Sequence, residues 1–438
     1  MSPSLILGIF LFYTIILFTV TWFTVRHADS QSFFTGNRKS PWFVVAYGMI
    51  GASLSGVTFM SVPGWVKDTQ FSYMIVVLGY LFGYLVIALV LLPLYYRLRL
   101  TSIYSYLEQR FGFWSYKTGA GFFIISRVLG ASLRMFLVIS VLQSFVFDSW
   151  HIPLWVNALI FIILIVLYTL KGGIRTIVWT DTLQTTFMLL AVILTIIFIG
   201  KGLGTPVSRL FSEITGSKVS GMIVTDWHHQ RFFLKQFFSG MFITITMTGL
   251  DQEMMQKNLS CKNLKEARKN MFTFSGILVF VNLLFLFLGA FLMLYADRNG
   301  LTLTSSDELF PTIALKYLRP AAGIVFMIGL VSAAFPSADG AITSLTTVFS
   351  IDFLGLERKN GISAGKATTI RYIVHLVIAL VFFLSIMIFS TLKNKAVIDE
   401  LFTIAGYTYG PLLGLYAFGI FTRRKANDKA VPGIAILS

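Results

Sequence analysis

Three charged side chains lie deep inside apolar stretches of this sequence. They are Asp339 in LVSAAFPSADGAITSLTTVF (330–349), Asp181 in LKGGIRTIVWTDTLQ (170–184) and Arg134 in SRVLGASLRMFLVIS (126–140). A carboxylate can coordinate a hard cation, and a guanidinium can bind a carboxylate through two parallel hydrogen bonds. Because a charge in the hydrocarbon core costs about 2.5–3.5 kcal/mol, each of these should face a partner or a water-filled cavity.

Each charge also has a purely structural interpretation. Asp339 could be protonated and hydrogen-bonded to a neighbouring helix, and Asp181 could be an acid at a helix start, which the helix dipole favours. Arg127, two helical turns before Arg134, could extend to the membrane surface or pair with a cytoplasmic loop. Arg134 lies too deep in its segment to reach the surface easily, so it is the stronger candidate for anion recognition.

Small and hydroxyl residues are concentrated in two segments, GMIGASLSGVTFMSVPGW (48–65) and the 330–349 stretch around Asp339. Such residues allow close helix packing, which is the more common reason for them. They are also typical of an unwound helix whose carbonyl groups coordinate a cation. Pro336 removes a backbone hydrogen bond and is expected to bend its helix.

The elements that must position these residues are membrane helices. The chain has 438 residues, of which 56% are hydrophobic and only 12% charged. This composition excludes disordered, collagen-like, nucleic-acid-binding and ordinary soluble proteins, and predicts an all-α polytopic membrane protein. Eleven segments are long and apolar enough to cross a membrane, namely 4–26, 42–65, 71–96, 119–147, 153–170, 176–202, 233–256, 271–296, 321–350, 367–392 and 398–421. A further apolar run, 431–438, reads as the start of a truncated helix.

The distribution of Lys and Arg predicts the orientation. With the N-terminus outside, the inside loops hold about 22 of them and the outside loops about 11, in agreement with the positive-inside rule. The five in the loop near 257–269 (Lys257, Lys262, Lys265, Arg268 and Lys269) are counted as inside. The net charge of +16 therefore indicates topology and not a nucleic-acid surface. Residues 104–113 are expected to form a short helix at the cytoplasmic face.

Other chemistry finds little support. No P-loop is present, and no Ser/His/Asp or zinc-ligand spacing stands out, so we do not expect an enzyme. The single cysteine, Cys261, excludes an internal disulfide. Four of the five histidines fall in loops, which argues against a histidine proton relay.

Three stretches together resemble the sodium/solute symporter family, whose fold is that of the bacterial leucine transporter. They are GNRKSPWFVVAYGMIGASLSGVTFM (36–60), LKGGIRTIVWTDTLQ (170–184) and GLDQEMMQKNLSCKNLKEARKN (249–270) followed by SAAFPSADGAITSLTTVFSID (332–352). The resemblance implies one extra N-terminal helix followed by two five-helix repeats of inverted topology. The corresponding divisions are 1–41, 42–202 for the first repeat, 203–232 for an external loop, 233–421 for the second repeat and 422–438.

The resemblance also implies ion sites. Na⁺ would be the co-transported ion, held at a first site by the carbonyl groups of Gly51, Leu54 and Ala333 and the hydroxyl of Ser337. Pro336 stands where the family normally has a second hydroxyl. A possible second cation site would use Asp181, Asp339 and Gly340, with an acid replacing a serine. In the alternative, Asp339 is protonated or coupled to protons and the second sodium is lost.

Substrate contacts are implied at the family's midplane site. Ser55 and Thr58 match substrate-contacting positions, and the weaker candidates are Tyr73, Arg134, Phe402, Thr403 and Tyr407. Arg134 together with the two acids favours a small organic anion such as an acidic sugar resembling sialic acid, carried with more than one cation by alternating access. A neutral sugar, polyol or amino acid is the alternative, with Arg134 structural.

Two other classes of membrane protein are alternatives to a symporter. A channel would need a selectivity filter or a charged ring, and the sequence shows neither. A transporter-linked sensor domain is the remaining alternative. We expect the lipid bilayer of a plasma (bacterial inner) membrane, a small solute and sodium as the partners, with no nucleic acid and no obligate protein partner.

Overall fold

The computed structural model describes residues 3–25, 30–301, 306–356, 363–391 and 397–438, and the described residues are almost entirely helical. The longer helices are α1 (Pro3–Val25), α3 (Trp42–Ser53), α4 (Gly56–Thr69), α5 (Tyr73–Val86), α8 (Phe113–Phe145), α9 (Leu154–Gly172), α10 (Ile174–Gly202), α12 (Phe233–Thr244), α14 (Leu264–Arg298), α16 (Pro320–Val348), α17 (Ala364–Thr391) and α18 (Val397–Phe421). The short helices are α2 (Ser30–Thr35), α6 (Leu92–Arg97), α7 (Ser105–Arg110), α11 (Val207–Thr215), α13 (Gln252–Leu259), α15 (Leu309–Thr312) and α19 (Val431–Leu437).

The helices confirm a polytopic membrane protein. Among the described residues, nine helices are long and apolar enough to cross a membrane, or ten when the bent pair α3 and α4 is counted as one span. The remaining predicted span, 233–256, is interrupted. It consists of α12, a π-helical turn (η5, Ile245–Gly249) and then α13 after a break at Leu250–Asp251. The expected surface helix at 104–113 is present as α7.

Two broken spans meet in the middle of the molecule. The chain leaves α3 at Leu54 and enters α4 after Ser55, with a bend of 59° between the two helices. The second break separates η5 from α13, and Asp251 caps the first turn of α13 by accepting a hydrogen bond from the Met254 N–H. Each break exposes helix ends whose backbone groups lack partners within the helix.

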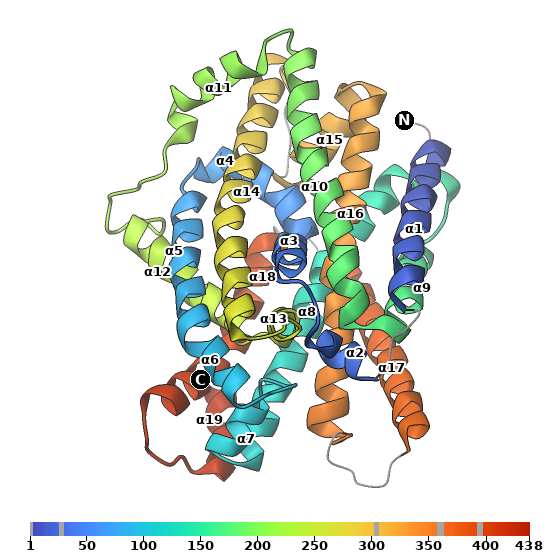
Figure 1. Ribbon diagram of the computed structural model, residues 1–438. Helices are drawn as coiled ribbons and strands as arrows, with labels where there is room; N and C mark the ends of the chain where they lie inside the picture. The colour runs from blue at the N-terminus through green and yellow to red at the C-terminus, as the bar shows by residue number, and fades with distance from the viewer. Residues whose placement is uncertain (1–2, 26–29, 302–305, 357–362, 392–396) are drawn as a thin grey trace.

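Long helices surround these breaks (Figure 1). α10 packs against both α3 and α16, and α18 packs against α8. α5 and α12 lie together on one side of the molecule, and α1, α9 and α17 lie on the other. α16 is the most enclosed span, and it continues as a single helix through Pro336. The arrangement of the two inverted repeats stays a prediction.

Candidate functional site

A cavity of about 110 Å³ lies at the break between α3 and α4. Its wall comes from α3 and α4, from α5 and α8, and from the second broken span, and it includes Ser55, Thr58, Tyr73 and Arg134. Four of the predicted substrate-contacting residues are therefore brought together by the tertiary structure. They come from three separate helices, which only folding can place side by side.

Arg134 is the cation of this cavity that lacks a counter-charge. Among the described residues, no carboxylate lies within 4.0 Å of its guanidinium, and its buried Nε atom has no hydrogen-bond partner. The N-terminal end of α4 packs against the same part of α8, since a Cβ at Gly56 would lie 2.5 Å from Val138 and 3.9 Å from the Arg134 carbonyl oxygen. A helix N-terminus and an unpaired guanidinium both favour an anion.

The rest of the wall is aromatic and hydroxyl-bearing. Tyr73, Tyr80 and Tyr84 line one side, and the hydroxyl groups of Tyr73 and Tyr80 are 3.0 Å apart. Thr248 of η5 and Asn282 of α14 face them from other elements. This mixture of rings and hydrogen-bonding groups suits a compact polar solute.

An outer cavity of about 490 Å³ lies next to the inner one. Tyr73 and Ile243 line both cavities, and Trp65 lines the outer one. Arg231 and Lys235 also line it, and two cationic side chains in a cavity favour anions. The outer cavity therefore lies at the start of α12, beside the segment that was predicted to be an external loop.

Of the candidates on the last core helix, Thr403 and Tyr407 do not line the cavity. Tyr407 is 79% exposed, and Thr403 is also exposed on α18. The side chain of Phe402 lies outside the described residues. Instead, Ala405 and Tyr409 face a small pocket beside Arg127 and Arg134. A helix exposes a different face at each residue, and the sequence does not reveal which face of α18 points inward.

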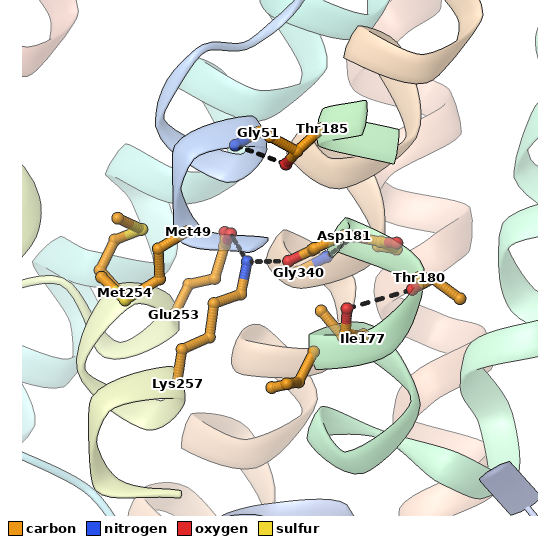
Figure 2. A network of polar contacts seen from close by, with 12 residues as sticks. Met49, Gly51, Ile177, Thr180, Asp181, Thr185, Glu253, Met254, Lys257 and Gly340 are labelled. Carbon is orange, nitrogen blue, oxygen red and sulfur yellow. Dashed lines mark hydrogen bonds and ion pairs between the residues drawn. The ribbon is translucent and has the colours of Figure 1, made fainter. Parts of the chain in front are cut away.

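A network of buried charges adjoins the cavity through Arg127. Lys257 of α13 is only 1% exposed, and its Nζ lies 2.7 Å from Asp181 Oδ2 and 3.2 Å from Glu253 Oε1 (Figure 2). Arg127, which is 6% exposed and lines the cavity, forms ion pairs with Glu253 and with Asp251.

This network corrects three sequence-based interpretations. Lys257 is not a loop residue, because α13 extends the broken span and carries it into the core. Asp181 is not a helix-start acid, since α10 begins at Ile174 and has no acid in its first turn. Arg127 does not extend to the membrane surface, because it is paired inside the protein.

Asp339 is held by hydrogen bonds to neutral groups. The Tyr168 hydroxyl of α9 donates to its Oδ2 at 2.6 Å, and the Gly340 N–H donates to its Oδ1 at 2.5 Å. This agrees with the interpretation in which Asp339 is bonded to a neighbouring helix. Asp181 comes from α10 and pairs with Lys257, so the two acids predicted for a second cation site face different partners, a lysine and the Tyr168 hydroxyl.

The residues predicted for the first sodium site lie where α16 packs against α3 and α4. Leu54 sits at the break with non-helical backbone angles, and Ala333 is fully buried. The Ser337 hydroxyl is buried and has no hydrogen-bond partner. Gly51 is fixed against α10, because its N–H donates to the Thr185 hydroxyl at 3.0 Å.

Glu253, Asp251 and Lys257 are the site residues that sequence reasoning missed. Their signal was present as an acid and a base spaced i and i+4 in DQEMMQK, but a short polar stretch after an apolar segment reads as a loop. Tyr168, Tyr80 and Tyr84 were hidden in the same way among many aromatic residues in apolar helices.

Comparison with known proteins identifies similar sequences and a similar fold. A model of the sodium:solute symporter family matches residues 33–436. The sodium/sialic acid symporter SiaT of Proteus mirabilis is 22% identical over 95% of this chain and 84% of its own length. The sodium/sialic acid symporter NanT of Aliivibrio fischeri is 22% identical over 98% and 85%. The solved structure of a Na⁺-coupled sialic acid symporter, substrate-bound and outward-open, matches with a TM-score of 0.83 at 20% identity over 95% of this chain and 87% of that one.

Proposed function

The chain belongs to the sodium:solute symporter family, so it is a sodium-coupled secondary transporter of a small solute and not an enzyme, and we propose that its solute is an organic anion of the acidic-sugar class. The observation that carries this proposal is Arg134, a guanidinium that lines the central cavity and has no carboxylate of the described residues within 4.0 Å. The relatives named for sialic acid support the acidic-sugar class.

The solute carboxylate would bind between Arg134 and the start of α4. Arg134 supplies paired N–H donors, and the hydroxyl groups of Ser55 and Thr58 line the same cavity. The sugar hydroxyls would then meet Tyr73, Tyr80 and Asn282.

Sodium would bind between α3 and α16. The carbonyl groups of Gly51, Leu54 and Ala333 and the Ser337 hydroxyl are oxygen ligands of the kind that hard cations prefer. A sodium ion there would join the broken helix to α16, and the same break forms the solute cavity. Sodium binding therefore stabilises the conformation that accepts the solute, and alternating access follows when the core rocks around both.

The outer cavity supports an orientation. It lies beside residues 230–243, on the face that the positive-inside rule assigns to the outside. In this orientation the N-terminus would lie outside, in a plasma (bacterial inner) membrane, and the solute would enter through the outer cavity. The two five-helix repeats, 42–202 and 233–421, would then supply one broken span each.

Uptake into proteoliposomes tests the anion proposal. Sialic acid uptake should require an inward sodium gradient. In Arg134→Ala the half-saturating concentration should rise about 10- to 150-fold, because a charge-assisted contact of about 1.5–3 kcal/mol is lost. The half-saturating concentration of Arg134→Lys should lie between those of the wild type and Arg134→Ala, because lysine keeps the charge but not the paired donors.

Arg209→Ala is the matched control, because Arg209 is an exposed arginine on α11 and should leave uptake unchanged. Sodium-dependent uptake of a neutral sugar, polyol or amino acid, with the same affinity in Arg134→Ala, would refute the anion proposal and favour the neutral alternative.

A further inference from the structure

We propose that the Lys257 ammonium is a built-in cation that fills the second cation site, so that this symporter couples solute uptake to a single sodium ion. The inference rests on the sodium-coupled symport stated above. It places the side chain of Lys257 where the family resemblance implied a second free cation.

The geometry of the site carries the proposal. The Lys257 Nζ lies 2.7 Å from Asp181 Oδ2 and 3.2 Å from Glu253 Oε1, within a group of side chains that are at most 1% exposed (Figure 2). A free cation beside Asp181 would have to share this carboxylate with an ammonium at hydrogen-bond distance. Two positive charges at such separations in a poorly solvated site repel each other strongly.

The third predicted member of the site, Gly340, packs against Glu253. A Cβ at Gly340 would clash with Glu253 Oε1, so the α16 backbone lies directly on the carboxylate that holds Lys257. Asp339, next to it, already accepts hydrogen bonds from Tyr168 and from the Gly340 N–H. The acid that replaces a serine in this family position is therefore engaged, and Asp181 and Glu253 are the carboxylates that the lysine neutralises.

The lysine is also connected to the solute cavity. Glu253 bonds Lys257 through Oε1 and forms an ion pair with Arg127 through Oε2. Arg127 lines the cavity seven residues before Arg134 on α8, which is two turns along the same face. Lys257, Glu253 and Arg127 all lie at or beside the breaks in the two broken spans. Alternating access is expected to move the backbone at these breaks.

Sodium-dependent thermal stability tests the proposal without any solute. The purified full chain in detergent is heated in sodium chloride or in choline chloride at equal ionic strength. Lys257→Met leaves Asp181 without its cation and Glu253 with Arg127 alone, so sodium should now bind beside Asp181. The sodium-induced rise in Tm should exceed that of the wild type by at least about 2 °C.

Two matched variants make the readout specific. Lys265→Met removes an exposed lysine of α14 and should behave as the wild type. Adding Asp181→Asn to Lys257→Met removes the new ligand and should abolish the extra sodium response. An equal sodium response in Lys257→Met and in the wild type would overturn the proposal.

A second measurement does not depend on the stability of a lysine variant. The ratio of ²²Na⁺ to sialic acid carried by wild-type proteoliposomes should be one, and Asp181→Asn should change the half-activating sodium concentration by less than about twofold. A ratio of two, or a large loss of sodium affinity in Asp181→Asn, would show that Asp181 binds a free sodium and would contradict the inference. Absence of sialic acid uptake would count against the solute proposal alone, because the thermal assay contains no solute.

Discussion

At the scale of single residues, two arginines of α8 differ in the charged groups around them. Arg127 is enclosed by the carboxylates of Glu253 and Asp251, whereas Arg134 has no carboxylate within 4.0 Å among the described residues. The first holds the broken span together, and the second is available to a ligand. Both belong to one face of one helix, so their different roles follow from their neighbours and not from their residue type.

Arg127 should therefore be needed for stability. Arg127→Met removes the ion-pair partner of the buried Asp251 and leaves Glu253 with Lys257 alone, so the free energy of unfolding should fall by about 3–5 kcal/mol. The exposed pair between Arg298 and Glu213, whose side chains are 37% and 43% exposed, offers a comparison, since Arg298→Met should cost less than about 1 kcal/mol. Thermal unfolding in detergent measures both, and similar losses would contradict the structural role given to Arg127.

At the scale of elements, short segments hold the ends of long helices. Asp428 accepts hydrogen bonds from the Trp114 N–H at 2.9 Å and from the Ser115 N–H and hydroxyl at 2.7 Å, so a residue far along the chain caps the start of α8. Partial burial opposes ionisation of Asp428, but these hydrogen bonds outweigh it and lower its pKa below the ordinary 3.8. The helix dipole of α8 acts in the same direction.

Removal of this cap should destabilise α8 in a pH-dependent way. Asp428→Ala should lower the free energy of unfolding near neutral pH by about 1 kcal/mol, as for other capping residues. Because the folded-state pKa is depressed, the stabilisation by the charge is complete above 3.8 and is lost as the pH falls through the folded-state pKa. Asp428→Asn keeps a hydrogen-bond acceptor but not the charge, so its free energy of unfolding should equal that of the wild type at low pH. A difference that stays constant with pH would show that the charge of Asp428 does not stabilise α8.

At the scale of the whole molecule, the net charge moved in each transport cycle decides how the membrane potential affects uptake. One sodium carried with one monovalent anion moves no net charge, provided that Lys257 stays with its carboxylates. A potential of 100 mV supplies about 2.3 kcal/mol per charge, which is about fifty-fold in accumulation. A transporter that moved a second sodium would gain this factor.

Sialic acid uptake should therefore be insensitive to an imposed negative-inside potential. Valinomycin and a potassium gradient set the potential in proteoliposomes at a fixed sodium gradient, and initial rates with and without it should agree. In Lys257→Met, uptake that survives should become faster with a negative interior, because a second sodium then accompanies the anion. Faster uptake by the wild type under the same potential would mean that net positive charge enters with each solute.

The sequence by itself determined the membrane class and, within the part of the chain that the structure describes, ten of the eleven predicted spans as continuous or bent helices, and it singled out Asp181, Asp339 and Arg134. These conclusions depend on hydropathy and on the cost of charge in hydrocarbon, which are local properties of a segment. The cavity members Ser55, Thr58, Tyr73 and Arg134 were also accessible, through the resemblance to a family.

Only the tertiary structure decided which charges meet. Lys257 reads as a cytoplasmic lysine until the break at Leu250–Asp251 turns α13 into the core, where it reaches Asp181 of α10. Tyr407 reads as a candidate substrate contact until the rotation of α18 places it outside and Tyr409 inside. Both outcomes depend on how helices distant in the chain pack and rotate, and a residue's partner across such an interface is not encoded in the pattern of its own segment.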